Sequence, residues 1–160
     1  MAEADARRQR RARRAMNTSE YVSLGHPDKT ADYISEWILD EALRQDSATR
    51  YAVEVQAKDN VVNLAGEITT KASLDFAKLA KEAVEDIGYT AEYAKCWGEN
   101  NCIDPTKLEV YAYISQQSPD IAQGVDKDAW GDQGIFWGMA TPDKSTDYMR
   151  KDYWLAKTIC

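Results

Sequence analysis

The chain has 160 residues, of which 44% are hydrophobic and five are tryptophan, so it is long enough to bury the core of one domain. No apolar run approaches the ~20 residues that a membrane-spanning helix requires. The net charge of −7 argues against nucleic acid as a partner, because an acidic surface repels phosphate groups.

Residues 1–15 differ in composition from the rest of the chain, since they contain six arginines and two acidic residues. Without them, 14 basic and 25 acidic residues remain, which is a net charge of −11. We interpret residues 1–18 as a disordered Arg-rich extension, with Met16 as an alternative translation start. A nucleic-acid-binding arm and a targeting peptide are the other interpretations of such a segment.

The three cysteines, Cys96, Cys102 and Cys160, do not follow a common zinc-binding spacing, and a single histidine is present to assist them. Their number is odd, so they cannot all pair within one chain. We therefore expect reduced thiols, as in a cytoplasmic protein.

The first patterned segment starts at Gly25-His26-Pro27-Asp28-Lys29, which contains the only histidine. Proline is favoured in the first turn of a helix, where its missing N–H costs nothing. Residues 30–46 continue with apolar side chains at helical spacing, among them Ile34 and Ile38. The stretch therefore predicts a helix start, whose free N–H groups suit an anion such as phosphate. A capped helix with a surface histidine explains the same residues.

Two strands are predicted next, at residues 51–56 and 61–68, with a turn at Lys58-Asp59-Asn60 between them. In the first strand, Val53 and Val55 lie on one face and Glu54 lies on the other. The pattern is typical of a hairpin with one buried face.

The rest of the chain is predicted to alternate between regular elements and loops. Residues 72–87 form the clearest helix, with Gly88 as its C-terminal cap. Loops are expected at 89–106 and 116–133, strands at 109–115 and 134–140, and a last helix from residue 151. Together these elements predict an α+β fold, a mostly antiparallel sheet with helices packed on one face.

Four short segments place a carboxylate, an amide or an imidazole beside glycine or proline at the end of a predicted element. They are Gly25–Lys29, Gly66–Thr70, Gln117–Asp126 and Gly131–Gly134. In this order and spacing the chain, from about Ser19 to about Tyr148, resembles the N-terminal portion of the S-adenosylmethionine synthetases (methionine adenosyltransferases). The resemblance implies a synthetase N-terminal domain at 19–141 with a lid loop at 117–131, followed by the truncated start of a next segment at 142–160.

The resemblance also implies an activity. Enzymes of this family join the methionine sulfur to C5′ of ATP by displacement, release triphosphate and hydrolyse it, with Mg²⁺ and K⁺ as cofactors. They are cytoplasmic homodimers or dimers of dimers, with active sites between two subunits. The partners implied are ATP and L-methionine, with no nucleic acid and no membrane.

Carried over residue by residue, the resemblance assigns six side chains. His26 is the catalytic, ATP-binding histidine that donates to the phosphates, Asp28 a Mg²⁺ ligand and Glu54 the K⁺ ligand. Glu67, Gln117 and Asp132 are implied to hold methionine. Considered alone, the same residues are also explained as a helix-start histidine, a first-turn aspartate, and polar residues of strands and loops.

The chain also departs from the family pattern. The segment before Gly131 is short, which makes closure of the lid uncertain, and Trp130 is explained equally by adenine stacking or by packing beneath the loop. The family's later segments, which supply cations to the triphosphate, do not follow. We expect the imidazole and the nearby carboxylates to converge on one cleft completed by other protein, and the isolated chain to have little activity. The alternative is a non-catalytic truncated module that pairs with a full-length subunit.

Overall fold

The computed structural model describes residues 17–98, 102–116 and 134–160. Its contacts divide the chain into two units, one of residues 23–134 and one that combines residues 1–22 with 135–160. In the described part of the chain, no helix has both the length and the apolar character needed to cross a bilayer.

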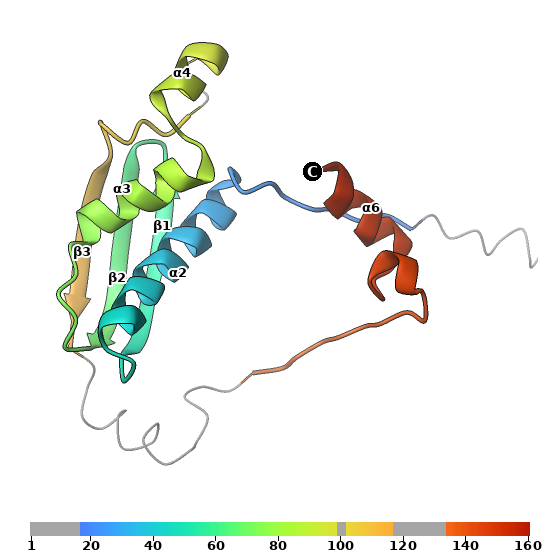
Figure 1. Ribbon diagram of the computed structural model, residues 1–160, viewed down its shortest axis with the longest axis horizontal. Coiled ribbons are helices and arrows are strands. Elements are labelled where there is room, and N and C mark those ends of the chain that lie inside the picture. Colours follow the sequence, from blue (N-terminus) through green and yellow to red (C-terminus); the bar gives the residue numbers. More distant parts are fainter. Residues whose placement is uncertain (1–16, 99–101, 117–133) are drawn as a thin grey trace, which may run out of the picture. The chain divides into compact units, whose positions relative to one another are not determined.

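The larger unit is a three-stranded sheet with two long helices on one face (Figure 1). Helix α2 packs on β1 and beside α3, and α3 also contacts β3. The α+β class and the one-sided helical layer are confirmed. The elements in chain order are α2 (Pro27–Gln45), β1 (Arg50–Lys58), β2 (Val61–Thr69), α3 (Phe76–Ile87), α4 (Ala91–Trp97) and β3 (Glu109–Ser115).

The sheet is mixed, because only one of its two strand pairings is antiparallel. Strands β1 and β2 form the predicted hairpin, while β2 and β3 run parallel, from Val61 opposite Glu109 to Glu67 opposite Ser115. Helices α3 and α4 carry the chain back to the hairpin turn, where Asn60 fixes the start of β3. Its backbone oxygen accepts a bond from the N–H of Glu109 at 2.8 Å, and its side-chain oxygen accepts one from the N–H of Asp104 at 2.7 Å.

Strand alternation gives the sheet two different faces. Val53, Val62 and Leu64 are buried beneath the helices, whereas Glu54 points to the opposite face and is exposed. The predicted orientation of these side chains is confirmed. The fully buried hydrophobic residues that α2 and α3 add on the helical side are Ile34, Ile38, Ala42, Ala80, Ala83 and Val84.

Both long helices start at capping residues rather than where the apolar pattern begins. Helix α2 starts three residues before the predicted position, because His26 caps it and Pro27 occupies its first turn. Helix α3 starts at Phe76, four residues later than predicted, because the Asp75 side chain accepts a bond from the N–H of Lys78 at 3.0 Å. Gly88 caps its end as predicted, with φ 116°.

The prediction of a loop over 89–106 is wrong at α4. Thr90 caps this short helix by accepting a hydrogen bond from the N–H of Tyr93 at 3.2 Å. None of its residues is buried, so the segment has no apolar period from which a helix can be predicted.

The smaller unit contains the short helix η2 (Lys144–Thr146) and helix α6 (Lys151–Ile159), which confirms the predicted last helix. The Ser19 hydroxyl donates to Asp152 at 2.8 Å, and the rings of Tyr21 and Tyr153 meet edge to face at 5.9 Å. The prediction of a strand at 134–140 is wrong, since this segment has no strand pairing among the described residues. Its apolar residues remain exposed, Trp137 by 93%.

Candidate functional site

His26 links the loop before α2 to the first turn of that helix. Its Nδ1 accepts a hydrogen bond from the backbone N–H of Asp28 at 3.2 Å, so the imidazole is the N-cap of α2. An accepting Nδ1 requires the proton of a neutral imidazole to be on Nε2. The His26 side chain is 41% exposed, and no hydrogen bond of its Nε2–H is found within the described residues.

Asp28 supplies a carboxylate beside this imidazole. Its side chain is 92% exposed, and its Oδ2 lies 4.0 Å from Nδ1 of His26. The carboxylate sits in the first turn of α2, where the helix dipole favours negative charge. The corner formed by His26 and Asp28 thus offers one hydrogen-bond donor and one hard oxygen ligand at a helix N-terminus, which together suit a phosphate group with its cation.

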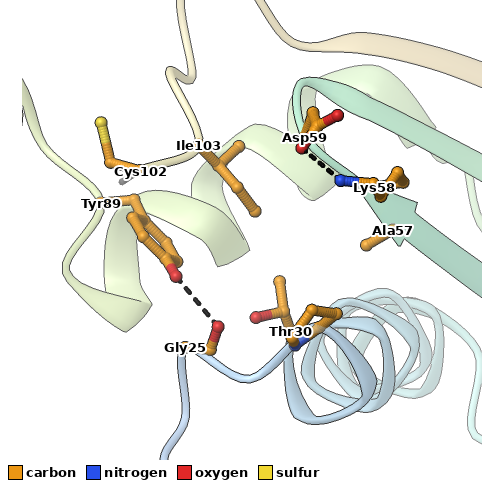
Figure 2. Close-up of a pocket in the computed structure, with 9 residues that line it drawn as sticks. Gly25, Thr30, Ala57, Lys58, Asp59, Tyr89, Cys102 and Ile103 are labelled. Atoms are coloured by element: carbon orange, nitrogen blue, oxygen red, sulfur yellow. Dashed lines mark hydrogen bonds and ion pairs between the residues drawn. The ribbon is translucent and has the colours of Figure 1, made fainter. Parts of the chain in front are cut away.

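The loop that carries His26 covers a cavity of about 240 Å³ (Figure 2). Thr30 of α2 and Ala57 of β1 line one side of it, and Tyr89 lines the other. In Figure 2 the Tyr89 hydroxyl points at Gly25, to whose carbonyl oxygen it donates a hydrogen bond at 3.0 Å. The cavity shows that the start of α2 lies at the hairpin end of the sheet.

Glu54 and Glu67 lie elsewhere, on the sheet face that the helices leave free. Glu67 is paired with Ala52, and Glu54 follows two positions further along β1 on the same face. In this diagonal arrangement the backbones of the two glutamates are roughly 7–8 Å apart. Ser115 and Ala52 flank the half-buried Glu67 on the neighbouring strands, so its immediate cross-strand neighbours are small side chains.

The structure therefore brings the predicted residues together as two pairs and not as one group. Glu67 is level with Ala52 of β1, which is five residues, or roughly 17 Å along the strand, from Ala57 at the cavity near the start of α2. Both glutamates also face away from α2. The prediction that the imidazole and the carboxylates converge on one cleft is thus wrong for a single copy of the chain. Strand alternation and strand length separate them. Gln117 and Asp132 lie outside the described residues.

In the described ranges, no group of three histidine, cysteine, aspartate or glutamate side chains is arranged to hold a metal ion. The donor chemistry still fits the two predicted cations in part. Asp28 is an exposed carboxylate of the kind that shares Mg²⁺ with phosphate oxygens, and the exposed Glu54 carboxylate would be one oxygen ligand for K⁺. Each site needs further oxygen ligands from substrate, water or other protein.

Sequence reasoning missed Tyr89 and Thr30 as neighbours of the histidine. Thr30 is fully buried, and its hydroxyl donates to the carbonyl oxygen of Leu24 at 3.1 Å. The sequence signal that could have identified it is a threonine in the first turn of a predicted helix, where its hydroxyl can bond the preceding loop. Tyr89 is 64 residues from its partner Gly25, and no local pattern predicts such a contact.

Fold and site define a class of protein: an α+β domain with polar groups at a histidine-capped helix start and, separately, on a free sheet face. Comparison with known proteins narrows this class. The family model of the S-adenosylmethionine synthetase N-terminal domain matches residues 14–119. The chain therefore belongs to the S-adenosylmethionine synthetase family.

Similar proteins agree with this assignment. The chain is 45% identical over 134 residues to an S-adenosylmethionine synthase of Akkermansia muciniphila, a match that covers 78% of the chain and 33% of that protein. It is 43% identical over 137 residues to the Mesoplasma florum S-adenosylmethionine synthase, covering 83% of the chain and 34% of the relative. The structure of an unusual S-adenosylmethionine synthetase from Campylobacter jejuni matches 90% of the chain and 35% of its own length, with 33% identity and a TM-score of 0.76. The chain thus spans about a third of the length of the relatives it matches.

Proposed function

We propose that this chain supplies two separate parts of a composite active site that makes S-adenosylmethionine from ATP and L-methionine. The sulfur attacks C5′ of ATP, the bond from C5′ to the triphosphate oxygen breaks, and the triphosphate is then hydrolysed. The observation that carries the proposal is the His26 corner, in which Nδ1 accepts a hydrogen bond in the helix cap, so that the proton of the neutral ring is on Nε2 of a partly exposed side chain.

The first part handles the leaving group. In the displacement, negative charge accumulates on the triphosphate oxygen that leaves C5′. A preorganised N–H at that position lowers the barrier, because it stabilises charge that is larger in the transition state than in the substrate. We assign this role to the Nε2–H of His26, supported by the partial positive charge of the α2 N-terminus.

The cations belong to the same proposal. Asp28 would hold Mg²⁺ together with phosphate oxygens, and Glu54 would contribute to a K⁺ site. Bound Mg²⁺ would neutralise part of the triphosphate charge. The contribution of the chain itself is to place a carboxylate beside the imidazole, since within the described residues Asp28 forms no ion pair with a lysine or arginine and its nearest charged-type neighbour is the ring of His26 at 4.0 Å.

The second part handles methionine. The Glu67 carboxylate suits the substrate ammonium, and Gln117 and Asp132 are proposed to complete the methionine site. Because Glu67 is far from His26 within one chain, we infer that the two parts of a site come from different copies. Residues 117–131 are proposed as the lid, residues 19–141 as the synthetase domain and residues 142–160 as part of the next segment.

A second candidate function is a non-catalytic module that pairs with another synthetase subunit. One observation favours pairing: on the free sheet face, Tyr111 is 44% exposed and Tyr113 is 70% exposed. Aromatic side chains exposed on a flat sheet face are typical of surfaces that bind protein. Such pairing is compatible with the composite site and does not require the His26 corner to bind phosphate.

The two candidates separate in a titration that follows the nitrogen resonances of His26, the only imidazole in the chain. Inorganic tripolyphosphate with Mg²⁺ is added to the ¹⁵N-histidine-labelled chain. We expect the Nε2 resonance to shift on binding, and Asp28→Asn to weaken the affinity only when Mg²⁺ is present. The matched control is Asp40→Asn, a second exposed carboxylate on α2.

An unchanged His26 spectrum at saturating Mg²⁺–tripolyphosphate would contradict the catalytic proposal and leave the pairing module. The same preparation, supplied with ATP, methionine, Mg²⁺ and K⁺, is expected to form little S-adenosylmethionine, because the glutamates of one copy face away from the helical side to which its own His26 belongs.

A further inference from the structure

The turn before α2 is held by an unusually complete set of hydrogen bonds. Four consecutive carbonyl oxygens, those of residues 23–26, each accept one bond. The donors to the Ser23, Leu24 and His26 oxygens all come from within residues 26–30. The donor to Gly25 is the Tyr89 hydroxyl, which comes from the segment that follows α3. Tyr89 is therefore the donor that ties the turn to the rest of the domain.

This bond controls the peptide unit that immediately precedes His26. The carbonyl oxygen of that unit accepts from Tyr89 at 3.0 Å, and its N–H, which belongs to His26, donates to the Ser23 oxygen at 3.0 Å. A peptide unit is planar, so fixing both of its ends fixes its rotation. That rotation sets φ of His26, which is −64°, and with it the direction of the imidazole.

Sterics favour the same arrangement. A Cβ atom at Gly25 would lie 2.7 Å from the Tyr89 hydroxyl oxygen, which is closer than real side chains approach. Gly25 and Tyr89 both line two cavities, of about 240 and 220 Å³. Without the hydroxyl, the turn has room to move.

We propose that Tyr89 is a positioning residue, which holds the peptide before His26 so that Nδ1 stays on the helix cap and Nε2–H points at the phosphate. Only the phosphate partner in this inference rests on the proposed function of His26. The effect of Tyr89 on the orientation of the imidazole is expected in the ligand-free chain as well. Burial also raises the pKa of the Tyr89 hydroxyl, so it remains a donor.

The test uses Tyr89→Phe, which removes the hydroxyl and keeps the ring. In the ligand-free chain at about pH 8, where an ordinary imidazole is neutral, the two His26 nitrogens should give one acceptor-type and one N–H-type ¹⁵N resonance. We expect Tyr89→Phe to move both resonances toward the average of the two tautomers, and to weaken Mg²⁺–tripolyphosphate binding about three- to tenfold. The matched control is Tyr93→Phe, whose ring lies 5.6 Å from that of Tyr89, and it should leave both resonances in place.

A second variant keeps the proposal testable if Tyr89→Phe unfolds. Gly25→Ala places a methyl group against the hydroxyl and should disturb the His26 resonances in the same way. Tyr89→Phe removes the oxygen with which the alanine clashes. Gly25→Ala should therefore lower the stability of the Tyr89→Phe variant by less than it lowers the stability of the wild type. Unchanged His26 resonances in both single variants, or strictly additive losses of stability, would overturn the inference. If the wild type does not bind tripolyphosphate, but Tyr89→Phe and Gly25→Ala change the His26 resonances as described, only the proposed function is overturned.

Discussion

The polar residues of this domain act through local hydrogen bonds that the surrounding backbone fixes. His26 illustrates this, because its Nδ1 caps α2 and thereby places the proton of the neutral ring on Nε2. Asp104 is a second example: its carboxylate accepts from the Thr106 hydroxyl at 2.6 Å and pairs with the Lys107 ammonium at 3.1 Å. Both residues stand at the hairpin end of the sheet, where Asn60 bonds the backbone of Asp104.

The Asp104 interactions predict a pH-dependent contribution to stability. Hydrogen bonds from the Thr106 hydroxyl and from Lys107 lower its pKa from the ordinary 3.8 to about 2. Because the folded-state pKa is the lower one, the stabilisation is present above 3.8 and is lost as the pH falls toward about 2. We expect Asp104→Asn to have a lower unfolding midpoint in urea than the wild type at pH 7, and the difference to shrink as the pH is lowered to about 3.

Asp40→Asn serves as the control, because this exposed carboxylate of α2 makes no hydrogen bond or ion pair in the described ranges. Its midpoint should differ little from that of the wild type at either pH. A difference for Asp104→Asn that is the same at pH 7 and at pH 3 would show that the charge of Asp104 contributes nothing.

Among the elements, the hairpin sets the two faces of the sheet. Gly66 of β2 lies close to the backbone of β1: its φ is 150°, and a Cβ there would lie 2.1 Å from the carbonyl oxygen of Ala52. Glycine is required at such a position, because any side chain collides with backbone atoms that cannot rotate away. The same strand places Glu67, the next residue, on the free face.

We therefore expect Gly66→Ala to lower the free energy of unfolding by about 3 kcal/mol, through backbone strain and the clash with β1. Gly138→Ala is the control, because nothing lies within 4 Å of its added Cβ. It should change the stability by less than about 0.5 kcal/mol. Chemical denaturation of the two variants measures the difference, and equal stabilities would mean that the β1–β2 pairing relaxes freely at this point.

The elements also show what the sequence predicts well and what it does not. Alternation in β1 and β2 and the apolar stripes of α2 and α3 predicted their faces, because burial imposes a period that the residues carry. Helix α4 buries nothing and was missed, and the parallel pairing of β3 depends on a contact at Asn60 that no local pattern contains. Likewise, the motif around His26 predicted its polar chemistry, whereas no local pattern predicted the hydrogen bond from the Tyr89 hydroxyl to the preceding residue, Gly25.

At the scale of the whole molecule, the arrangement of the predicted site residues is the main result. A family motif predicts which residues bind the substrates, but it carries no information on which of them share a ligand within one chain. The sheet lies between His26 and Asp28 on the helical side and the two glutamates on the free face, and Glu67 is also roughly 17 Å along the strand from the hairpin end. The proposed composite site takes its two parts from different copies of the chain, and the exposed tyrosines of β3 lie on the face that the glutamates occupy.

The most direct test of the composite site is a pulsed electron-spin distance measurement between labels near its two parts. Leu24→Cys and Glu67→Cys are labelled in a chain whose native cysteines, Cys96, Cys102 and Cys160, are replaced by serine. In doubly labelled chain diluted with unlabelled chain, we predict a distance of roughly 17 Å or more. In a mixture of the two singly labelled chains with Mg²⁺–tripolyphosphate, we predict an additional, between-chain distance. A within-chain distance clearly shorter than about 17 Å, or no between-chain distance at all, would contradict the composite site.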